Sequence, residues 1–308
     1  KGIVLQEPSV VAIDTNTDKI LKVGREAQLM LGRTPGNITA VRPLRDGVIS
    51  RYEVTLKMIQ YFIRRACGNL FVPPNVMICI PSGITEVEER AVKDAAREAG
   101  ARRTYLIEEP TAAAIGAGLN IYAPEGNMVV DIGGGTTDIA VLSLGGVVVS
   151  ESIKIAGDKF DEAIARYVRR KYKVLIGERS AEAIKKRIGT VYSRPQLLSM
   201  EVKGRCVNQG LPKVITVTSK EMIEALAEPV TAILDAICTV IEKTPPELLG
   251  DILRNGIVMT GGGSLLYGFD QLVTRATGIK TRVAPDAVSC VALGTGKSLD
   301  NLDMFEAK

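Results

Sequence analysis

A glycine-rich turn that follows an acidic residue is the segment of this sequence most suited to chemistry. Residues 127–132 read as a buried strand containing Asp131, and residues 133–136 are Gly-Gly-Gly-Thr. Glycines lack a Cβ atom, so consecutive backbone N–H groups can converge on an anion such as phosphate. Asp131 at the strand end is placed to hold a water molecule bound to a metal ion. A strand and not a helix follows the glycines, which distinguishes the segment from a P-loop or a dinucleotide fingerprint; a purely structural hairpin is the alternative.

A second glycine-rich segment lies near the end of the chain. Residues 256–259 read as a strand, and Thr260-Gly261-Gly262-Gly263-Ser264 connects this strand to a helix. Such a loop can present backbone N–H groups and a helix N-terminus to a phosphate or a sugar. For this loop alone, a structural turn is an equal alternative. Together, the two loops predict a clamp for a nucleotide.

The composition limits which chemistry is available. The chain has 308 residues, no histidine and a formal net charge of +4. The absence of histidine excludes Ser-His-Asp triads, Cys-His triads and His-ligated zinc, so acid–base chemistry must come from carboxylates, Lys, Tyr or Cys. Basic residues are not gathered in one tail or on one face, so no nucleic-acid partner is expected.

The elements that must position these loops alternate in type. Short β-branched runs alternate with amphipathic stretches of helical period, which predicts an α/β fold. The expected strands are residues 9–13, 76–80, 104–107, 128–132, 139–142, 147–149 and 256–259. The expected helices are residues 51–66 and a helix that runs from a Thr85 cap to about residue 100. At about 150 residues per domain, the length favours two domains.

The α/β pattern occurs twice along the chain. The strand at 76–80 leads into a Pro-Ser-Gly loop and a helix, and the strand at 257–259 leads into the second glycine-rich loop and a helix. A Pro-x-Ala turn then follows in each half, at Pro110 and at Pro285. Two copies of one unit predict two similar α/β domains that face each other across a ligand-binding cleft.

Cysteine usage and hydropathy indicate the compartment. The five cysteines are scattered without a C-x-x-C pair, as expected of free thiols in a reducing compartment. No signal peptide opens the sequence, and no apolar run approaches the roughly 20 residues of a membrane-spanning helix, so we expect a cytoplasmic protein. The chain begins with Lys1-Gly2 and strand-like residues 3–5 without Met, which indicates that its beginning is missing.

Several segments carry a resemblance to a known superfamily. Residues 131–138 resemble the second phosphate loop of the actin, heat-shock chaperone and sugar-kinase ATPases, residues 107–114 their first connecting helix, and residues 257–264 their adenosine loop. Within this superfamily the chain resembles the MreB-type bacterial actins of rod-shaped cells, a group that includes the paralogue Mbl. Further matching segments are residues 2–13, 32–36, 42–49 and 176–179. The resemblance is collinear over essentially the whole chain.

The resemblance implies an actin-like ATPase fold. Two duplicated ribonuclease H-like α/β domains would surround a nucleotide cleft. The first lobe is expected at residues 1–120 and the second at 121–308, with a helical subdomain inserted at about 176–230. The family opens with a strand and a first phosphate loop that we expect to be missing from this sequence. Hydrolysis by these 308 residues alone is therefore not implied.

The resemblance also assigns site residues. Glu109 matches the family's water-positioning carboxylate and Asp131 its metal-side aspartate, which acts through water; these two form the expected catalytic pair. A carboxylate near a magnesium-bound triphosphate can orient water for in-line attack, whereas the alternative for Glu109 is an acid stabilised by a helix dipole. For Glu182 and Lys185, the i, i+3 spacing also fits an intrahelical ion pair. The expected nucleotide-binding residues are Gly133, Gly134, Gly135, Thr136, Gly157, Asp158, Glu182, Lys185, Gly261, Gly262 and Gly263.

The function implied by the resemblance is that of a cytoskeletal ATPase. It would bind ATP or ADP with Mg²⁺, couple hydrolysis to polymerisation with itself into paired protofilaments, and lie peripherally on the inner face of the cell membrane. There it would direct cell-wall synthesis and maintain rod shape together with membrane-bound partners of the RodZ, MreC and MreD type. The alternatives are a chaperone-type ATPase, a sugar kinase or a plasmid-segregation actin.

An apolar loop is the candidate membrane contact. Residues 68–74 contain two prolines and a Gly-Asn pair, which mark a loop, and Leu70 and Phe71 are apolar where solvent is expected. Arg64 and Arg65 lie just upstream, and apolar insertion beside cations suits an anionic leaflet. In the family this loop inserts into the membrane. The equal alternative is that Phe71 and Val72 pack into the core of their own lobe.

Overall fold

The computed structural model describes residues 2–45, 48–68 and 72–300. The chain forms two compact units. One contains the residues up to Glu108 together with those from Thr295 onward, and the other is Glu109–Gly294. The division therefore lies before the expected lobe boundary at residue 120, and the end of the chain joins the first unit.

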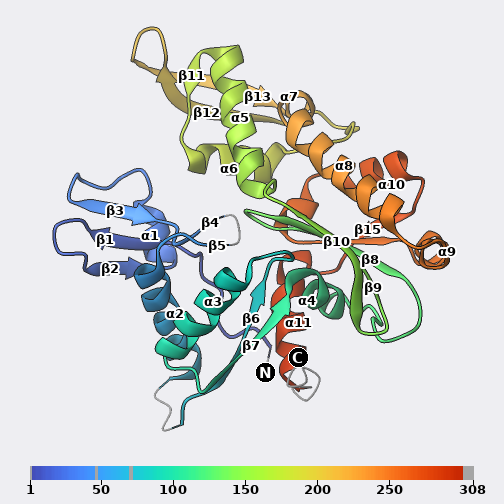
Figure 1. Ribbon diagram of the computed structural model, residues 1–308. Helices are drawn as coiled ribbons and strands as arrows, with labels where there is room; N and C mark the ends of the chain where they lie inside the picture. The colour runs from blue at the N-terminus through green and yellow to red at the C-terminus, as the bar shows by residue number, and fades with distance from the viewer. Residues whose placement is uncertain (1, 46–47, 69–71, 301–308) are drawn as a thin grey trace. The chain divides into compact units, whose positions relative to one another are not determined.

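In its described residues, the first unit contains a small antiparallel sheet, a hairpin, a parallel strand pair, helices α1, α2 and α3, and the last residues of α11 (Figure 1). The sheet has the order β2-β1-β3, β4 pairs with β5, and β6 runs parallel to β7. The elements are β1 Val11–Asp14, β2 Ile20–Val23, α1 Arg25–Met30, β3 Ile38–Val41, β4 Leu44–Arg45, β5 Val48–Ile49, α2 Tyr52–Cys67, β6 Asn75–Ile80, α3 Glu86–Glu98 and β7 Arg103–Glu108.

The two helices expected in this unit are confirmed. Helix α2 directs Met58 into the core that includes β1, with Val54 and Phe62 packed beside it, as its apolar i, i+4, i+8 spacing requires. Helix α3 begins after the expected Thr85 cap. The backbone N–H of Glu88 donates to the Thr85 hydroxyl at 3.3 Å, and the Thr85 N–H donates to the Glu88 carboxylate at 2.8 Å, which is a capping box.

The strand-like segment at residues 3–5 does not form a strand. Ile3 is 45% exposed and Val4 is 67% exposed. A strand persists only when a neighbouring strand satisfies its backbone groups, and no strand in the described part of the chain pairs with this segment. The prediction from β-branched composition was therefore wrong here.

The second unit is built on a five-stranded sheet of order β10-β9-β8-β14-β15. Strands β8, β9 and β10 form an antiparallel meander, whereas β14 runs parallel to both β8 and β15. The sheet strands are β8 Asn127–Ile132, β9 Thr137–Ser143, β10 Gly146–Ile153, β14 Ile257–Thr260 and β15 Thr281–Val283. The remaining helices around it are α4 Glu109–Gly116, α8 Ala227–Lys243, α9 Pro246–Asn255, η1 Gly262–Leu265, α10 Phe269–Thr277, η2 Ala287–Ser289 and α11 Cys290–Ser298.

Alternation along β8 separates two cores. Met128 and Val130 belong to the large cluster that contains the α8 side chains, whereas Val129 packs with Ala113 of α4. Because side chains alternate between the faces of a strand, Asp131 shares the face of Val129 and lies on the α4 side. In Figure 1, α4 lies beside β8 and β9. The sheet alternation therefore directs Asp131 toward the helix that begins with Glu109.

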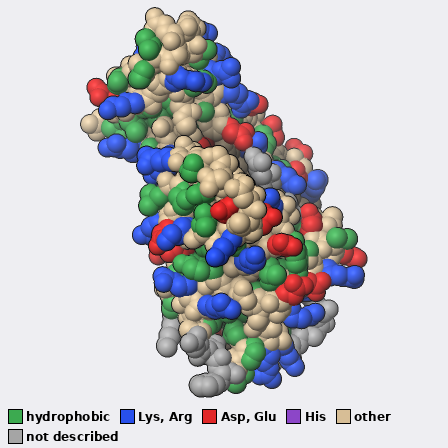
Figure 2. All heavy atoms as spheres, turned by 90° about the vertical axis from the view of Figure 1, so that its left-hand side faces the viewer, with side chains coloured by type: hydrophobic (Ala, Val, Ile, Leu, Met, Phe, Trp, Pro, Cys, Tyr) green, Lys and Arg blue, Asp and Glu red, His purple; other side chains and the backbone are tan. Residues whose placement is uncertain are grey.

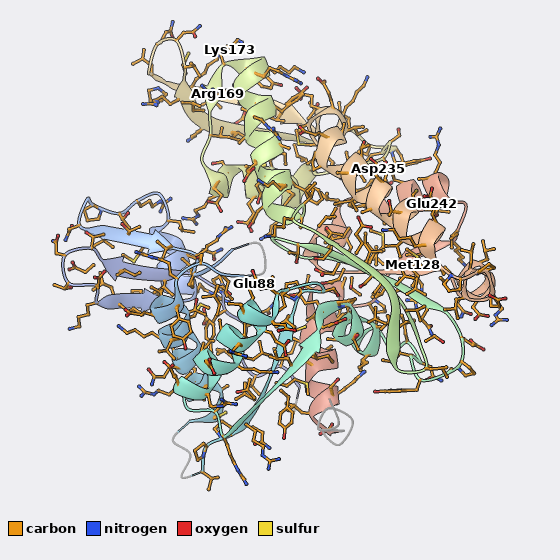
Figure 3. The ribbon with its side chains drawn as sticks, in the orientation of Figure 1. Glu88, Met128, Arg169, Lys173, Asp235 and Glu242 are labelled. Atoms are coloured by element: carbon orange, nitrogen blue, oxygen red, sulfur yellow. The ribbon has the colours of Figure 1, made fainter. Side chains whose placement is uncertain are left out.

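Helix α8 shows the same division between core and solvent. It buries Ile233 and Ile237 toward the sheet, while Asp235 and Glu242 are exposed. Figure 3 shows these two acids along α8 and Met128 within the sheet. The helix is thus amphipathic, and its apolar stripe covers the sheet face opposite α4.

The segment expected to be a helical insertion at about 176–230 is mixed. It contains a three-stranded antiparallel sheet of order β11-β12-β13 as well as helices. Its elements, together with the helix that precedes it, are α5 Gly157–Tyr172, β11 Val174–Leu175, α6 Glu178–Ile188, β12 Ser199–Cys206, β13 Pro212–Thr218 and α7 Ser219–Ala225. The expectation missed β12 and β13, whose alternation of buried and exposed residues is typical of a sheet with one solvated face.

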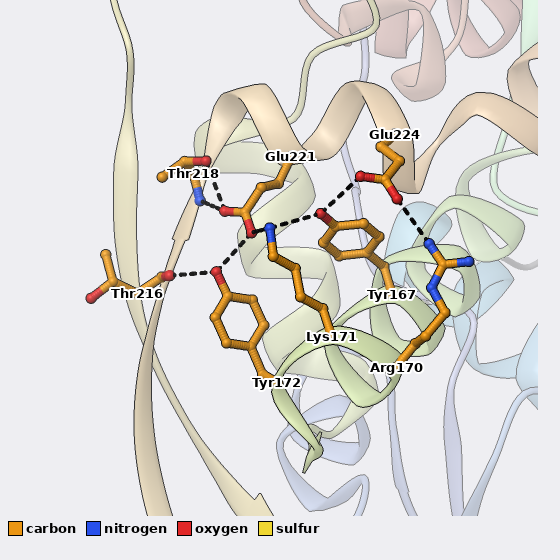
Figure 4. Close-up of polar contacts among 8 residues, drawn as sticks. All are labelled: Tyr167, Arg170, Lys171, Tyr172, Thr216, Thr218, Glu221 and Glu224. Carbon is orange, nitrogen blue, oxygen red and sulfur yellow. Dashed lines mark hydrogen bonds and ion pairs between the residues drawn. The ribbon is translucent and has the colours of Figure 1, made fainter.

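A polar network holds α7 on the end of α5 (Figure 4). Lys171 of α5 contacts the Glu221 carboxylate at 2.6 Å, and the Tyr172 hydroxyl donates to the same oxygen at 2.7 Å. The Tyr167 hydroxyl donates to Glu224 at 3.2 Å. Burial alone would raise the pKa of Glu221, but the hydrogen bonds from Lys171, Tyr172 and Thr218 outweigh it and lower this pKa to about 2. The carboxylate therefore stays charged, and the contact persists at neutral pH.

Charges are mixed on the surface. Figure 2 shows Lys and Arg side chains interspersed with Asp, Glu and apolar side chains on the face that it draws. Among the helices of the described residues, none combines the length and the apolar composition that a membrane crossing requires.

Candidate functional site

Asp131 lies where three strands meet. The antiparallel register pairs it with Asp138 of β9, and the parallel register pairs it with Thr260 of β14. Asp131 is 4% exposed, and both neighbours are fully buried. The Thr260 hydroxyl donates to Asp131 Oδ1 at 2.7 Å. Because parallel strands end at the same sheet edge, β8 and β14 deliver the two glycine-rich loops side by side.

Glu109 reaches the same place from the start of α4. The Thr136 hydroxyl, at the tip of the β8–β9 hairpin, donates to Glu109 Oε2 at 3.5 Å, a weak bond at the outer distance limit. The charges of Asp131 and Asp138 both act on the Glu109 carboxyl. The structure thus brings together the two expected catalytic residues, Glu109 and Asp131.

Glycines fix the position of α4 against α11. A Cβ atom on Gly116 would overlap the backbone carbonyl of Cys290, and one on Gly294 would overlap the carbonyl of Ala112. The alanines at 112–114 are fully buried. The Ala-rich sequence of α4 therefore serves close helix packing, which holds Glu109 at the sheet edge.

Asp138 is a site residue to which the sequence analysis gave no role. It is fully buried and faces Asp131 across the hairpin. A hairpin that turns at residues 133–136 must pair positions 131 and 138. The sequence spacing of the two aspartates could therefore have predicted that they face each other. The result is a group of three carboxylates, Glu109, Asp131 and Asp138, at one edge of the sheet.

Two carboxyl groups of the site, those of Glu109 and Asp131, have raised pKa values. Burial, followed by the charges of Asp138 and Asp131, raises the pKa of Glu109 to about 8. Burial also raises the pKa of Asp131 to about 6, although the hydrogen bond from Thr260 lowers it in part. Buried like charges repel, and removal from water penalises the ionised form. A bound cation would offset both effects.

The raised pKa of Glu109 predicts how stability depends on pH. The folded carboxyl holds its proton up to about pH 8, whereas an unfolded one releases it near 4.3. The folded state therefore binds more protons across this window, and the nucleotide-free protein should lose stability as pH rises through it. Glu109→Gln should remove most of this slope above pH 6, so its stability relative to wild type should be about 2 kcal/mol greater at pH 8 than at pH 6.

Urea unfolding between pH 5 and pH 9 measures this effect. The control is Glu125→Gln, which removes an exposed carboxylate paired with Arg254 at 3.5 Å and should change stability by less than about 1 kcal/mol. Identical slopes for Glu109→Gln and wild type would contradict the assigned pKa of Glu109.

The first glycine-rich loop is anchored to α5 through the carbonyl groups of Gly133 and Gly134. The N–H groups of Gly157 and Asp158, in the first turn of α5, donate to the carbonyls of Gly133 and Gly134 at 3.1 and 2.8 Å. Within the described residues, the N–H groups of Gly134 and Gly135 donate no such bond. A Cβ atom on Gly134 would meet nothing within 4 Å. The tip is therefore open, with two backbone donors available to an anion.

The second loop lies against the first. Gly261 has φ +80°, and a Cβ atom there would overlap the carbonyl of Ile132 and lie 2.9 Å from Asp131 Oδ1. A Cβ atom on Gly263 would overlap the Ile132 side chain, whereas one on Gly262 would meet nothing within 4 Å. Close packing against Ile132 thus explains why positions 261 and 263 are glycines. Gly262 has no such packing role and is open to a ligand.

The α6 residues adopt a different pairing from the i, i+3 alternative. Glu182 contacts Lys186 at 2.6 Å. Lys185 instead contacts the Asp161 carboxylate at 2.9 Å and donates to the carbonyl of Gly157 at 2.8 Å. Lys185 therefore lies beside the first turn of α5, next to the first glycine-rich loop. Asp161, which sequence reasoning missed, is 6% exposed, and burial raises its pKa to about 6 although Lys185 lowers it.

The comparison with known families decides the identity. A model of the MreB/Mbl protein family matches residues 1–307. The chain belongs to the MreB/Mbl family. The resemblance drawn from the sequence is thereby confirmed.

Relatives in this family are named for cell shape. The chain is 54% identical over 304 residues to the cell shape-determining protein Mbl of Bacillus subtilis, covering 98% of this chain and 91% of that protein. It is 52% identical over 310 residues to the cell shape-determining protein MreB of Escherichia coli K12, covering 99% of this chain and 89% of that protein. The main functional expectation, a cell-shape protein of the bacterial cytoskeleton, is confirmed at this level.

Solved structures share the fold of this chain. The crystal structure of MreB5 of Spiroplasma citri bound to ADP matches with a TM-score of 0.94 and 38% identity, over 99% of this chain and 92% of that one. The MamK double helical filament matches with a TM-score of 0.81 at 22% identity, over 96% and 91%, and this match concerns the fold alone. The expected actin-like α/β fold is confirmed.

The carboxylates fit magnesium bound together with a nucleotide. In the part of the chain that the structure describes, no group of three or more His, Cys, Asp or Glu residues is arranged to hold a metal ion alone. Mg²⁺ prefers oxygen ligands, keeps several waters and is usually bound through one or two carboxylates together with substrate phosphates. Asp131, at the edge from which both loops emerge, suits such an arrangement through water.

The expected membrane residues of this MreB/Mbl chain, Leu70 and Phe71, lie outside the described residues. Val72, directly after them, is 62% exposed. Arg64 and Arg65 occupy the last turn of α2. The membrane contact therefore stays a prediction.

Proposed function

We propose that this MreB/Mbl protein binds ATP and ADP with Mg²⁺ at the edge formed by β8 and β14 and hydrolyses ATP there. The observation that carries the proposal is the placement of two glycine-rich loops, open at Gly134 and Gly262, beside a buried Asp131. The hydroxyl partner of Asp131, Thr260, comes from the strand that leads into the second loop. Structures of MreB5 of Spiroplasma citri bound to ADP and to AMPPNP support it. The nucleotide residues are those assigned from the sequence.

The chemistry divides between the chain and the metal. Mg²⁺, when bound with the nucleotide, supplies charge stabilisation for the phosphates. The open N–H groups of Gly134 and Gly135 hold phosphate oxygens, and Asp131 orients water of the metal shell. Glu109 orients the attacking water, and the Thr136 hydroxyl contacts its carboxylate through a weak hydrogen bond. The charge of Asp138 contributes to the raised pKa of Glu109.

We further propose that the protein polymerises with itself into paired protofilaments in a nucleotide-dependent way. The filaments would lie on the inner face of the cell membrane, where the loop with Leu70 and Phe71 inserts. They would direct cell-wall synthesis with membrane-bound partners of the RodZ, MreC and MreD type. Membership in a family whose relatives determine cell shape supports this extension.

Sedimentation with nucleotide and vesicles tests the proposal. The purified chain should pellet as filaments with ATP and Mg²⁺ and stay in the supernatant with EDTA, and electron microscopy should resolve pairs. Anionic vesicles should bind the filaments, while Leu70→Ser/Phe71→Ser should form filaments that leave the vesicles behind, because many weak insertions add up only in a polymer. Absence of nucleotide binding by the wild type would refute the proposal, and vesicle binding by the double variant would refute the membrane contact alone.

A further inference from the structure

Thr260 links the two glycine-rich loops through a polar contact. It is the last residue of β14, directly before Gly261, and it is fully buried. The parallel register places it beside Asp131 of β8. Its hydroxyl donates to Asp131 Oδ1 at 2.7 Å. The second loop therefore contributes a side-chain bond to the carboxylate of the first.

The bond engages one of the two carboxylate oxygens. The other oxygen, Asp131 Oδ2, takes no part in this bond. Asp131 keeps 4% of its surface exposed, at the strand end from which the first glycine-rich loop emerges beside β14. Oδ1 is therefore held by the Thr260 hydroxyl, whereas Oδ2 is not used by this bond.

The backbone around Thr260 makes this geometry rigid. Because Gly261 approaches the Ile132 carbonyl too closely for any Cβ atom, β14 and its loop are seated tightly against the end of β8. The Thr260 side chain is β-branched and has few rotamers. The hydroxyl therefore has little freedom to leave Asp131 unless the second loop moves.

We propose that Thr260 is a positioning residue that holds Asp131 Oδ1, so that Asp131 Oδ2 faces the water shell of a nucleotide-bound Mg²⁺ ion. The proposal rests on the nucleotide-binding function proposed above. It adds a residue outside the loops' glycines and assigns it to the metal side of the site. It also makes the second loop, which would contact the nucleoside, responsible for the carboxylate that serves the metal.

A packing role alone would not require the hydroxyl. Valine has nearly the shape of threonine and would fill the same space, but it cannot donate to Asp131. Outer-shell partners of metal ligands commonly contribute tenfold or more to metal affinity. The distinguishing quantity is therefore the gain in nucleotide affinity that Mg²⁺ provides, and not nucleotide affinity or stability as such.

The test measures binding of ADP and AMPPNP to the full chain by titration calorimetry, in excess Mg²⁺ and in EDTA. Thr260→Val should weaken binding about tenfold in Mg²⁺ and change it less than about twofold in EDTA. Thr260→Ser, which keeps the donor, should restore the gain from Mg²⁺. Thr281→Val is the matched control, because Thr281 is a buried threonine of the same sheet whose hydroxyl donates to the carbonyl of Ile279 at 3.1 Å.

The following results would overturn the positioning role of Thr260. An unchanged gain from Mg²⁺ in Thr260→Val, or an equal loss in Mg²⁺ and in EDTA, would overturn the positioning role while leaving nucleotide binding intact. Wild type that binds no nucleotide would overturn the proposed function and this inference with it. If Thr260→Val unfolds, Thr260→Cys, with a thiol that is a weak donor of similar size, should show a reduced gain from Mg²⁺, and a full gain would overturn the role.

Discussion

Replacing Glu109 with alanine is expected to abolish most phosphate release while nucleotide binding stays near that of wild type. The substitution removes a group that orients water and no group that contacts phosphate. Groups of this kind contribute roughly 100-fold or more to rate, and an interaction made only in the transition state affects turnover and not ground-state binding. Phosphate release under single-turnover conditions, together with ADP and AMPPNP titration, measures both quantities in the same preparation.

The adjacent acid provides the control. Glu108 precedes Glu109 in the sequence but ends β7, before α4 begins. Glu108→Ala should release phosphate within about threefold of wild type, since Glu108 belongs to β7, whereas it is Glu109 that accepts from the Thr136 hydroxyl of the first loop. Wild-type phosphate release by Glu109→Ala would remove Glu109 from the catalytic pair, and a larger loss in Glu108→Ala would transfer the role to Glu108.

Replacing Asp131 with alanine is expected to weaken the binding of Mg²⁺-nucleotide itself, by about tenfold or more. A buried carboxylate beside the phosphates positions the ion through water and offsets phosphate charge. The Thr260 hydroxyl would also lose its acceptor, which loosens the contact between the loops. Affinity for ATP or AMPPNP should fall in Mg²⁺ and change much less in EDTA.

A conservative variant separates charge from shape. Asp131→Asn keeps a carbonyl oxygen that can accept from Thr260 but lacks the negative charge. It should bind nucleotide in EDTA as wild type does and still lose most of the gain from Mg²⁺. An unchanged ATP affinity of Asp131→Ala in Mg²⁺ would contradict the metal-side role of Asp131.

The site could be predicted in part from local pattern. The hairpin around Gly133 and the loop around Gly262 could be predicted from runs of glycine between apolar strands. Glycine adopts the backbone conformations that tight turns require, so such a run identifies a turn without knowledge of distant contacts. Thr260 and Asp161 could not be found in this way. Their roles depend on partners 129 and 24 residues away in sequence, and no local spacing encodes such distances.

The errors of prediction have the same cause. Residues 3–5 have the composition of a strand, yet strand formation depends on a neighbour that local sequence does not specify. The region at 176–230 contains a clear helical period in α6. It also contains β12 and β13, which are joined by seven residue pairs. Strands that are exposed at about half of their positions, as β12 and β13 are, offer few buried apolar residues by which to identify them.

The sequence by itself determined the family, the α/β class and the two glycine-rich loops, since these depend on residue types at short, fixed spacing. The absence of histidine, likewise a property of sequence alone, limited the acid–base groups to carboxylates, Lys, Tyr and Cys. The tertiary structure decided which carboxylates meet. The parallel register of β8 and β14 placed Thr260 on Asp131, the hairpin placed Asp138 opposite it, and burial at that meeting point raised the pKa of Glu109 to about 8. Desolvation and charge repulsion depend on distances through space, and only the folded chain fixes those distances.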